Sequence, residues 1–402
     1  MTFPTVFVLG ASPTGLAVLR ALGPHGVRCR VGDVDSRRHA FRSRYRFGSP
    51  ILGSSPEQVV DSVLELAAEE RVKPLVIPTS DSMILALANS PKVIDGEVVV
   101  YRAITDGTAS KLVHKESFAK LCDDIGMATA DTAFPKSSED VLAAAEGRRF
   151  PLLLKPVLGH LWRDRLHGRK LLVVDSMSDL RKLVDGLADD CGELMVQELI
   201  PGPERNIYVA AIYRGVDGNR DYCFVAEKTR QHPPDFGSAS LATARFREEV
   251  AELSWEFVER ADFRGICGTE FKFDERDGVF KMIEVNPRPT LWFHLASASG
   301  VNLLHGACLD LTGRPVPPAA PQKDGTRWCF WEKDLLTWRH HLRKRDISPL
   351  SLLSTFSPAN HGAVGTLRDP GPFFASPAYY AGRLFQRTFG KSQRNKCETS
   401  NP

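Results

Sequence analysis

The sequence predicts an α/β protein in which a doubly wound parallel-sheet domain is followed by an α+β domain of two lobes. Up to about residue 105, short apolar runs alternate with helical patterns, which requires a parallel sheet with helices on both faces. Beyond residue 150, strands dominate and several are joined only by turns. We expect the first domain at residues 1–110 and the second at 111–318, with a small lobe at about 125–202 and a C-terminal extension at 319–402.

The first domain opens with a strand at Val6–Leu9, a Gly/Ser/Pro loop and a helical pattern that runs to Leu22. A second helix is predicted at Pro56–Glu69, because Ser55 is a good N-cap residue and Gln58 stands at the capping-box position. Further strands are predicted at Arg28–Asp33, Leu75–Ile77 and Val98–Tyr101.

The second domain begins with a helix that ends near Ile125. Its strands are predicted at Pro151–Lys155, Lys170–Val174, Leu194–Ile200, Asn206–Arg214, Tyr222–Thr229, Ile266–Asp274 and Val279–Val285. One more helix is predicted near Leu180–Leu187. The buried stripe of a later helix is predicted from helical spacing at Phe246, Val250, Leu253 and Phe257.

Composition excludes several classes of function. The net charge is only +3 and the basic residues are spread along most of the chain, which is unlike a nucleic-acid-binding surface. Eight cysteines at irregular spacings, without a CxxC pair, argue against a zinc site and against a disulfide framework. No stretch approaches the roughly 20 apolar residues of a transmembrane helix. We therefore expect a cytoplasmic protein that acts on small molecules.

The hairpin at residues 266–286 carries the residues best suited to chemistry. Glu284 and Asn286 share one face of their strand, where oxygen ligands suit Mg²⁺. Glu270 joins that face only if the hairpin has a three- or five-residue loop, or a β-bulge, since a plain four-residue loop places it opposite Ile283. Opposed Cβ atoms lie roughly 4.5–5.5 Å apart, which suits two metal ions about 3.5–4 Å apart. We predict the odd register, although the same residues are also typical of a solvent-facing hairpin.

Upstream motifs favour the metal site. An apolar strand ends in Phe150–Pro156, and another runs into Gln197–Glu204. Together with the hairpin, these motifs resemble the ATP-grasp superfamily, in the same order from about Lys115 to Arg288. In detail the chain is similar to carboxylate–amine ligases related to D-aspartate ligase, through Glu227–Gln231 and Phe236–Ser238. The doubly wound domain is then the pre-ATP-grasp domain that this family usually carries.

The resemblance implies a role for each matching residue. Lys115 and Lys155 match the two lysines that contact phosphates. The adenine hinge matches Gln197, Glu198 and Ile200, the last two through backbone groups, and Glu204 matches the acid that binds the ribose hydroxyls. Glu270, Glu284 and Asn286 match the magnesium ligands. Arg288 matches an arginine beside the transferring phosphate, with Lys228 and Arg230 facing the same region.

The implied activity is an ADP-forming ligase that joins a carboxylate to an amine through an acyl phosphate. ATP and two Mg²⁺ ions, with Mn²⁺ as an alternative, are the implied cofactors, and a homodimer is the common assembly of related enzymes. The loop at Gln231–Ser240 and the region Arg288–His294 are expected to form the walls around the two substrates. The sequence departs from the family pattern in two places. Gln197 stands where an acid is usual, and the loop Val157–Arg165 contains only one glycine, Gly159. The side chains of His160 and Arg163 would then replace the contacts that backbone amides of a glycine-rich loop make with the phosphates.

Two other activities fit parts of the sequence. The loop Gly10–Gly15 after the first strand is a possible dinucleotide-binding loop, which would indicate an NAD(P)-dependent oxidoreductase. Its spacing is not GxGxxG, however, and Pro13 lacks the backbone amide that a pyrophosphate needs. We expect it instead to offer Thr14 and the helix N-terminus to an anionic part of a substrate, while Asp33 ends a strand. An ATP-grasp kinase that phosphorylates without ligation is the second alternative.

The C-terminal segment Trp328–Arg345 combines tryptophans with a basic run. Such a segment either lies on a membrane or a partner, or forms a half-buried helix with a solvated basic face. We expect the half-buried helix.

Overall fold

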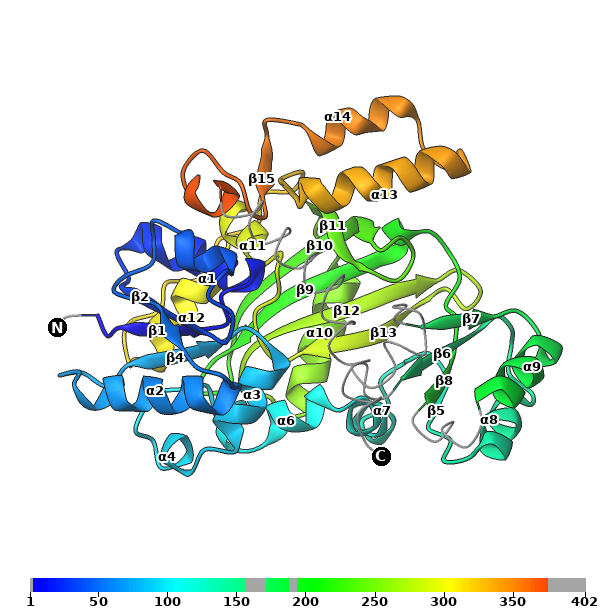
Figure 1. The fold of residues 1–402 in the computed structure, drawn as a ribbon, viewed down its shortest axis with the longest axis horizontal. Coiled ribbons are helices and arrows are strands. Elements are labelled where there is room, and N and C mark those ends of the chain that lie inside the picture. The colour runs from blue at the N-terminus through cyan, green and yellow to red at the C-terminus, as the bar shows by residue number, and fades with distance from the viewer. Residues whose placement is uncertain (1–2, 157–170, 188–193, 375–402) are drawn as a thin grey trace, which may run out of the picture.

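The computed structural model describes residues 3–156, 171–187 and 194–374. In these ranges the strands form three sheets, of four, seven and four strands. Figure 1 shows the N-terminal sheet at one end of the molecule, the large sheet in the middle and the small sheet at the other end. The class is the predicted one, an α/β protein with a parallel sheet followed by a two-lobed α+β part.

The N-terminal sheet is parallel, in the order β3-β2-β1-β4. On β1, Val6 and Val8 belong to the core beneath α1, while Phe7 and Leu9 belong to the core beneath α2. Because both faces are covered, every residue of this strand is apolar. The strands are β1 (Val6–Leu9), β2 (Cys29–Asp33), β3 (Ile51–Leu52) and β4 (Leu75–Pro78). The helices are α1 (Pro13–Leu22), α2 (Pro56–Ala68), α3 (Asp81–Ala88), α4 (Pro91–Ile94), α5 (Arg102–Thr105) and α6 (Thr108–Val113).

Two local predictions in this domain need comment. The Ser55 side chain accepts a hydrogen bond from the backbone amide of Gln58, as predicted for an N-cap. The Gln58 side chain, however, accepts from the backbone amide of Ser54 rather than completing the box at Ser55. The expected strand at Val98–Tyr101 makes only an isolated parallel bridge, between Leu75 and Val99.

The large sheet has the order β13-β12-β9-β10-β11-β14-β15, and its pairs are antiparallel except β14 with β15. Residues of β9 alternate between two cores: Ala210 and Ile212 lie in the core with α10, and Val209 and Ala211 in the core with α11 and α12. The strands are β9 (Ile207–Arg214), β10 (Arg220–His232), β11 (Ser238–Ala244), β12 (Gly265–Asp274), β13 (Val279–Asn286), β14 (Arg327–Cys329) and β15 (Asn360–Gly362). The helices are α10 (Glu248–Arg260), α11 (His294–Ala298) and α12 (Leu303–Leu311).

The predicted apolar stripe of α10 holds only in part. Val250 and Phe257 are fully buried and Leu253 is half-buried. Phe246 lies before the helix and is 50% exposed. Its inclusion was wrong because helical spacing does not reveal where a helix begins.

The small sheet has the order β5-β8-β6-β7 and is covered by α8 and α9. Leu152 and Leu154 of β6 pack into the core beneath these helices, so the alternate residues Leu153 and Lys155 face the other way. The elements of this lobe are β5 (Thr132–Ala133), α8 (Ser138–Ala145), β6 (Leu152–Pro156), β7 (Leu172–Val174), α9 (Met177–Leu187) and β8 (Leu194–Glu198). The preceding helix α7 (Lys115–Asp124) packs into the core of the large sheet with α10, through Phe118 and Cys122.

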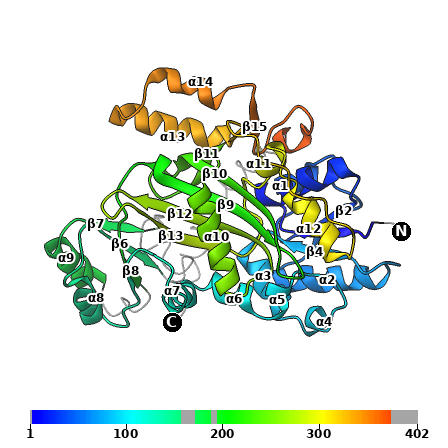
Figure 2. The same cartoon turned by 180° about the vertical axis from the view of Figure 1, so that it is seen from behind.

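The C-terminal segment is built into the large sheet. β14 pairs with β11, and Trp328 on β14 is fully buried. α13 (Trp331–Lys344) then packs against β10 and β11, and is followed by the short helices η5 (Pro349–Ser351) and α14 (Leu352–Thr355). Seen from behind in Figure 2, α13 and α14 lie along one edge of the molecule, opposite α2 and α4.

Candidate active site

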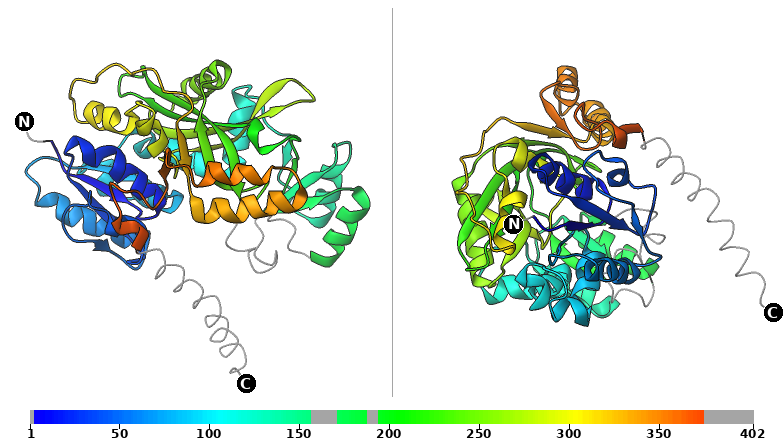
Figure 3. Two further views of the ribbon diagram at one scale, coloured as in Figure 1. Left: turned by 90° about the horizontal axis from the view of Figure 1, so that it is seen from above. Right: turned by 90° about the vertical axis from the view of Figure 1, so that its left-hand side faces the viewer.

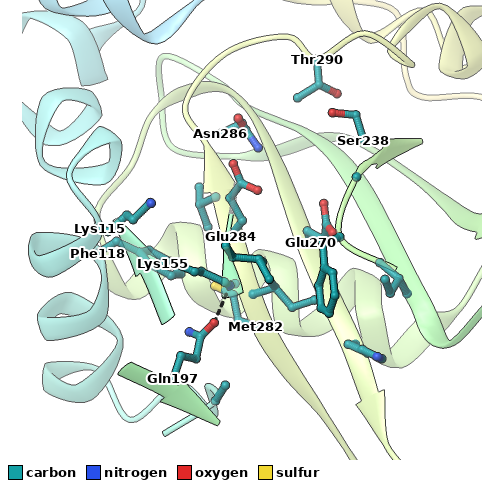
Figure 4. Close-up of a pocket in the computed structure, with 18 of the residues that line it drawn as sticks. Lys115, Phe118, Lys155, Gln197, Ser238, Glu270, Met282, Glu284, Asn286 and Thr290 are labelled. Carbon is teal, nitrogen blue, oxygen red and sulfur yellow. Dashed lines mark hydrogen bonds between the residues drawn. The ribbon is translucent and has the colours of Figure 1, made fainter. Parts of the chain in front are cut away.

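A cavity of about 700 Å³ lies where the three sheets meet. The N-terminal domain contributes Thr14, Ser80 and Asp81 to its wall. The small lobe contributes Lys155 and Gln197. The large sheet and its loops contribute Lys228, Gln231, Ser238, Glu270, Lys272, Glu284, Asn286, Arg288 and Thr290. Figure 4 shows Gln197 at one end of the cavity and Thr290 with Ser238 at the other, with the two glutamates between them.

The hairpin has the register that brings the two glutamates together. Asp274 pairs with Val279, which leaves a four-residue loop, but a bulge at Ile283 shifts the register between Phe271 and Glu270. Glu270 therefore lies directly opposite Glu284. The predicted odd register is confirmed, and the bulge is what produces it.

Glu270 of the glutamate pair is largely buried and is paired with a lysine. Lys228 Nζ donates to Glu270 Oε1 at 2.6 Å, and the side chains are only 5% and 15% exposed. Burial, together with the neighbouring Glu284, raises the pKa of Glu270 in spite of Lys228. Because the buried carboxylate of Glu270 lies directly opposite the carboxylate of Glu284, the pair fits a divalent cation.

The third expected ligand is an amide. Asn286 is two residues beyond Glu284 and points to the same side of the cavity in Figure 4. Within the described ranges no three His, Cys, Asp or Glu side chains come together as a metal site. A cation here would therefore be held by two carboxylates and an amide oxygen, a set of hard oxygen donors that suits Mg²⁺.

Both predicted phosphate lysines line the cavity. Lys115 begins α7 and its Nζ donates to the carbonyl oxygen of Pro156 at 2.7 Å. Lys155 Nζ donates to Gln197 Oε1 at 2.6 Å. Burial and the nearby Lys115 lower the pKa of Lys155 to about 8, against the opposing effect of Glu284 and Glu270. The two lysines place a concentrated positive charge beside the glutamates.

The residues of the predicted adenine hinge line the cavity, and their polar groups already form hydrogen bonds or ion pairs within the protein. The Gln197 oxygen accepts from Lys155, and its amide nitrogen donates to Thr132 Oγ1 at 2.8 Å. The Glu198 carboxylate is paired with Arg276 at 2.8 Å, and its backbone amide donates to the carbonyl oxygen of Asp131 at 2.9 Å. The carbonyl oxygen of Ile200 accepts from Lys272 Nζ at 2.7 Å. A base that binds to Gln197 must therefore compete with Lys155 for the amide oxygen.

Glu204 departs from its expected position. It is not among the residues that line the cavity, and its carboxylate accepts hydrogen bonds from the backbone amides of Gln231 and Asp235 at 2.9 and 2.8 Å. Burial raises the pKa of Glu204. Glu204 thus anchors the loop after β10, and its ribose contact stays a prediction. Asp235 of the same region lines the cavity.

Arg230 also departs from expectation, because β10 is irregular beside it. Register shifts on both sides of Arg230 interrupt the alternation that would put it on the face of Lys228. Its guanidinium instead forms a two-point pair with the fully buried Asp334 of α13, at 2.9 and 2.5 Å. Arg230 is a structural link to the C-terminal segment and is not part of the cavity wall.

Arg288 lines the cavity and joins it to the N-terminal domain. Its Nε donates to Asp81 Oδ1 at 2.7 Å, at the start of α3. The adjacent carbonyl oxygen of Pro287 accepts from the buried Tyr101 hydroxyl at 2.6 Å. Asp81 was not predicted, although Ser80-Asp81 directly after β4 is a helix start at the carboxyl end of a strand, where ligands often bind.

The far end of the cavity contains hydroxyl groups that the sequence did not single out. Thr290 is 9% exposed, and among the described residues its Oγ1 has no hydrogen-bond partner. Ser238 faces the same end in Figure 4. Both belong to the two predicted wall segments, which line the cavity along parts of their length. An unpaired buried hydroxyl is costly, so this end is suited to a polar ligand.

The expected behaviour of the first loop can be compared with the structure. Thr14 lines the cavity, as expected for contact with a substrate. The Asp33 carboxylate accepts hydrogen bonds from the backbone amides of Ala11 at 2.6 Å and Asp35 at 3.0 Å. These hydrogen bonds stabilise the loop that contains Asp33. They also occupy the carboxylate oxygens that would have to bind the ribose of a dinucleotide. The proposed contacts of His160 and Arg163 lie outside the described residues.

Comparison with known proteins shows which fold this is. The chain aligns with the ADP complex of N5-carboxyaminoimidazole ribonucleotide synthetase (purK) at a TM-score of 0.64, covering 86% of each chain at 16% identity. It aligns with biotin carboxylase from Campylobacter jejuni at a TM-score of 0.61, covering 80% of this chain and 74% of that one at 14% identity. A family model described as "ATP-grasp in the biosynthetic pathway with Ter operon" matches residues 190–332. The chain therefore has the fold of these enzymes, and its residues 190–332 match an ATP-grasp family model.

The curated relatives match only part of this chain and part of their own length. D-aspartate ligase of Enterococcus faecium is 24% identical over 207 residues, which are 48% of this chain and 48% of that protein. The carbamoyl phosphate synthase large chain of Thermotoga maritima is 24% identical over 284 residues, 64% of this chain and 23% of that protein. The chain thus spans about half or less of the length of these relatives.

Proposed function

We propose that this chain is an ATP-grasp protein, an ADP-forming ligase that joins a small carboxylic acid to an amine. The observation that carries the proposal is the cavity in which Glu270 opposes Glu284 and whose wall also contains Lys115 of α7 and Lys155 of the small lobe. Phosphoryl transfer depends mainly on positioning and on neutralising phosphate charge, and these groups are arranged for both.

We propose that ATP binds at one end of the cavity and the acid at the other. Lys115 and Lys155 hold the phosphates of ATP, with the base beside Gln197, Glu198 and Ile200. Two Mg²⁺ ions, replaceable by Mn²⁺ and held by Glu270, Glu284 and Asn286, would neutralise the phosphate tail when bound. The contact with Lys228 opposes the effect of burial and favours the ionised form of Glu270.

The acid would bind at the far end. Thr290 and Ser238 donate to its carboxylate, and Arg288 offsets the negative charge that builds up during transfer. A carboxylate oxygen forms a bond to the γ-phosphorus as the bond to ADP breaks, giving an acyl phosphate. The amine nitrogen then bonds to the acyl carbon, phosphate leaves, and the nitrogen loses a proton to form the amide.

The relatives narrow the first substrates to test. One curated relative is named D-aspartate ligase, so small amino acids are the first acids and amines to screen. We also propose a cytoplasmic location and a homodimer. The described cysteines are free, which is consistent with a reducing compartment. Within the described residues no helix has the length and apolar character needed to cross a membrane.

The decisive experiment is nucleotide binding followed by phosphate release. Mg·ATP should raise the melting temperature of the wild-type protein, and Glu284→Ala should abolish that rise because it removes one of the two opposed carboxylates. Glu248→Ala, an exposed glutamate on α10, is the matched control. Phosphate release that requires both an acid and an amine identifies the ligase, and release with the acid alone identifies a kinase. Stabilisation by NAD(P) but not by ATP would overturn the proposal in favour of the oxidoreductase.

A further inference from the structure

The C-terminal hairpin, residues 331–356, carries large apolar side chains that face solvent. Leu350 and Leu353 are 74% and 72% exposed, and Leu336 and Phe356 are both 55% exposed. Leu350, Leu353 and Phe356 recur every three residues through η5 and α14, which places them along one side. An apolar group of this kind on an outer edge marks an interaction surface.

Helix α13 presents two different faces. Asp334, Thr337 and His341 are buried against the large sheet. Leu336, Arg339 and Arg343 are all exposed, and at 100° per residue they lie on the opposite side of the helix. Figure 3 shows α13 and α14 on the outside of the molecule in both views. The outward face therefore combines a leucine with two arginines and has no partner within the described chain.

The charge of this face is positive. Arg345 is also exposed beyond Arg343, whereas Lys344 between them is paired with Asp235 at 3.5 Å. The acids of α13 lie elsewhere: Asp334 is fully buried against Arg230, and Glu332 is half-buried. The face thus attracts negatively charged partners.

The sequence that follows the hairpin has the same character. Residues 370–397 contain six aromatic residues and five lysines and arginines, with no aspartate or glutamate. Aromatic side chains prefer the boundary between lipid and water, and basic residues are drawn to anionic lipid headgroups. This composition and the exposed face point to the same chemical partner.

We propose that the C-terminal hairpin binds the surface of an anionic lipid bilayer. The leucines and Phe356 enter the headgroup region, and Arg339, Arg343 and Arg345 pair with lipid phosphates. Nucleic acid also offers phosphates, but it gives no place for Leu350 and Leu353. The inference is independent of the ligase activity, because the residues that carry it lie outside the cavity wall.

Vesicle binding by the full chain tests the proposal. The protein should co-sediment with vesicles of phosphatidylcholine that contain phosphatidylglycerol, and much less with phosphatidylcholine alone. Leu350→Glu with Leu353→Glu should weaken binding about tenfold, and so should Arg339→Glu with Arg343→Glu. Added salt should weaken binding of the wild type.

Matched controls separate this surface from general effects. Val72→Glu with Ile94→Glu changes two side chains on the N-terminal domain that are 47% and 51% exposed, and Arg71→Glu with Lys73→Glu reverses two exposed charges there. Both controls should bind vesicles as the wild type does, and the melting temperature of every variant checks folding. Three results would overturn the proposal: no binding to anionic vesicles, equal binding to neutral ones, or equal loss in the controls. Tight binding of a DNA duplex that survives the leucine changes would identify a nucleic acid as the partner instead.

Discussion

Lys155 shows how burial sets the chemistry of a single residue. Its amine lies at the end of β6 between Gln197 and the glutamate pair, and its pKa is lowered to about 8, mainly by burial. In the unfolded chain the amine titrates near 10.5, so between these two values the unfolded state binds more protons. Burying the protonated amine of Lys155 costs free energy, and this cost disappears as the amine loses its proton. The folded chain therefore becomes more stable as pH rises from about 8 to about 10.5.

The same shift predicts how ATP affinity depends on pH. A phosphate favours the protonated amine, so the Kd for ATP should rise by up to about tenfold per pH unit above pH 8. Calorimetry in buffers of different ionisation enthalpy should detect proton uptake on binding in this range. Lys155→Arg keeps a permanent charge and should lose both effects. A flat pH profile in the wild type would contradict the role of Lys155.

Thr290 gives a second prediction at this scale. Thr290→Val preserves the shape of the side chain and removes the unpaired buried hydroxyl, so the free protein should be as stable as the wild type or slightly more stable. If the hydroxyl donates to the acid substrate, KM for that acid should rise about tenfold while the KM for ATP stays constant. Steady-state phosphate release measures both. An unchanged KM for the acid would remove Thr290 from the substrate site.

At the scale of elements, the β12–β13 hairpin depends on one buried carboxylate in its turn. Asp274 is fully buried and accepts from Arg276 at 2.9 and 2.6 Å and from Lys281 at 2.7 Å. These hydrogen bonds, above all that from Arg276, hold the pKa of Asp274 well below its usual range. Asp274 therefore stabilises the hairpin that sets the positions of Glu270 and Glu284.

We expect Asp274→Asn to lower the free energy of unfolding by about 2 kcal/mol at neutral pH, since Arg276 and Lys281 lose their shared partner. A carboxyl whose folded pKa is depressed contributes stability above its unfolded pKa of about 4 and loses it as pH falls below that value. The difference between variant and wild type should therefore shrink below pH 4. Urea denaturation at several pH values measures it. The carboxylate of Asp277 is 42% exposed and pairs with Lys281 at 2.5 Å, so Asp277→Asn should cost much less.

At the scale of the whole molecule, the C-terminal segment holds a wall of the cavity. Thr337 of α13 donates to the carbonyl oxygen of Gln231 at 2.7 Å, and Lys344 lies 3.5 Å from Asp235. The Arg230–Asp334 pair, which Ser240 and Thr355 also contact at 2.8 and 2.6 Å, fastens the same helix to β10 and β11. Residues far apart in sequence thus position the loop at Gln231–Ser238.

Arg230→Met should reveal the structural role of this pair. The change leaves Asp334 buried without its cation, so we expect a loss of about 3–5 kcal/mol in the free energy of unfolding. Arg230→Met combined with Asp334→Leu should recover much of the loss. ATP-stimulated phosphate release by the folded fraction should stay within about threefold of wild type, because Arg230 lies outside the cavity wall. If the rate of phosphate release fell a hundredfold in the stable double variant, Arg230 would have a catalytic role after all.

Much of this architecture follows from patterns within the sequence. The apolar runs of the N-terminal domain require a sheet covered on both faces, and the spacing of Glu284 and Asn286 puts them on one side of a strand wherever that strand lies. The requirement that Glu270 adopt an odd register could be stated in advance, because side chains alternate with a period of two.

Other features were decided only by the tertiary structure. Arg230 contacts Asp334 and does not lie on the expected catalytic face, because register shifts flank it on both sides. The Glu204 carboxylate accepts hydrogen bonds from backbone amides of a loop that is distant in sequence. Asp81 reaches Arg288 only because the N-terminal domain packs against the large sheet. Local periodicity determines which side of its own element a residue faces, whereas the partner it meets there depends on bulges and long-range packing that no local pattern encodes.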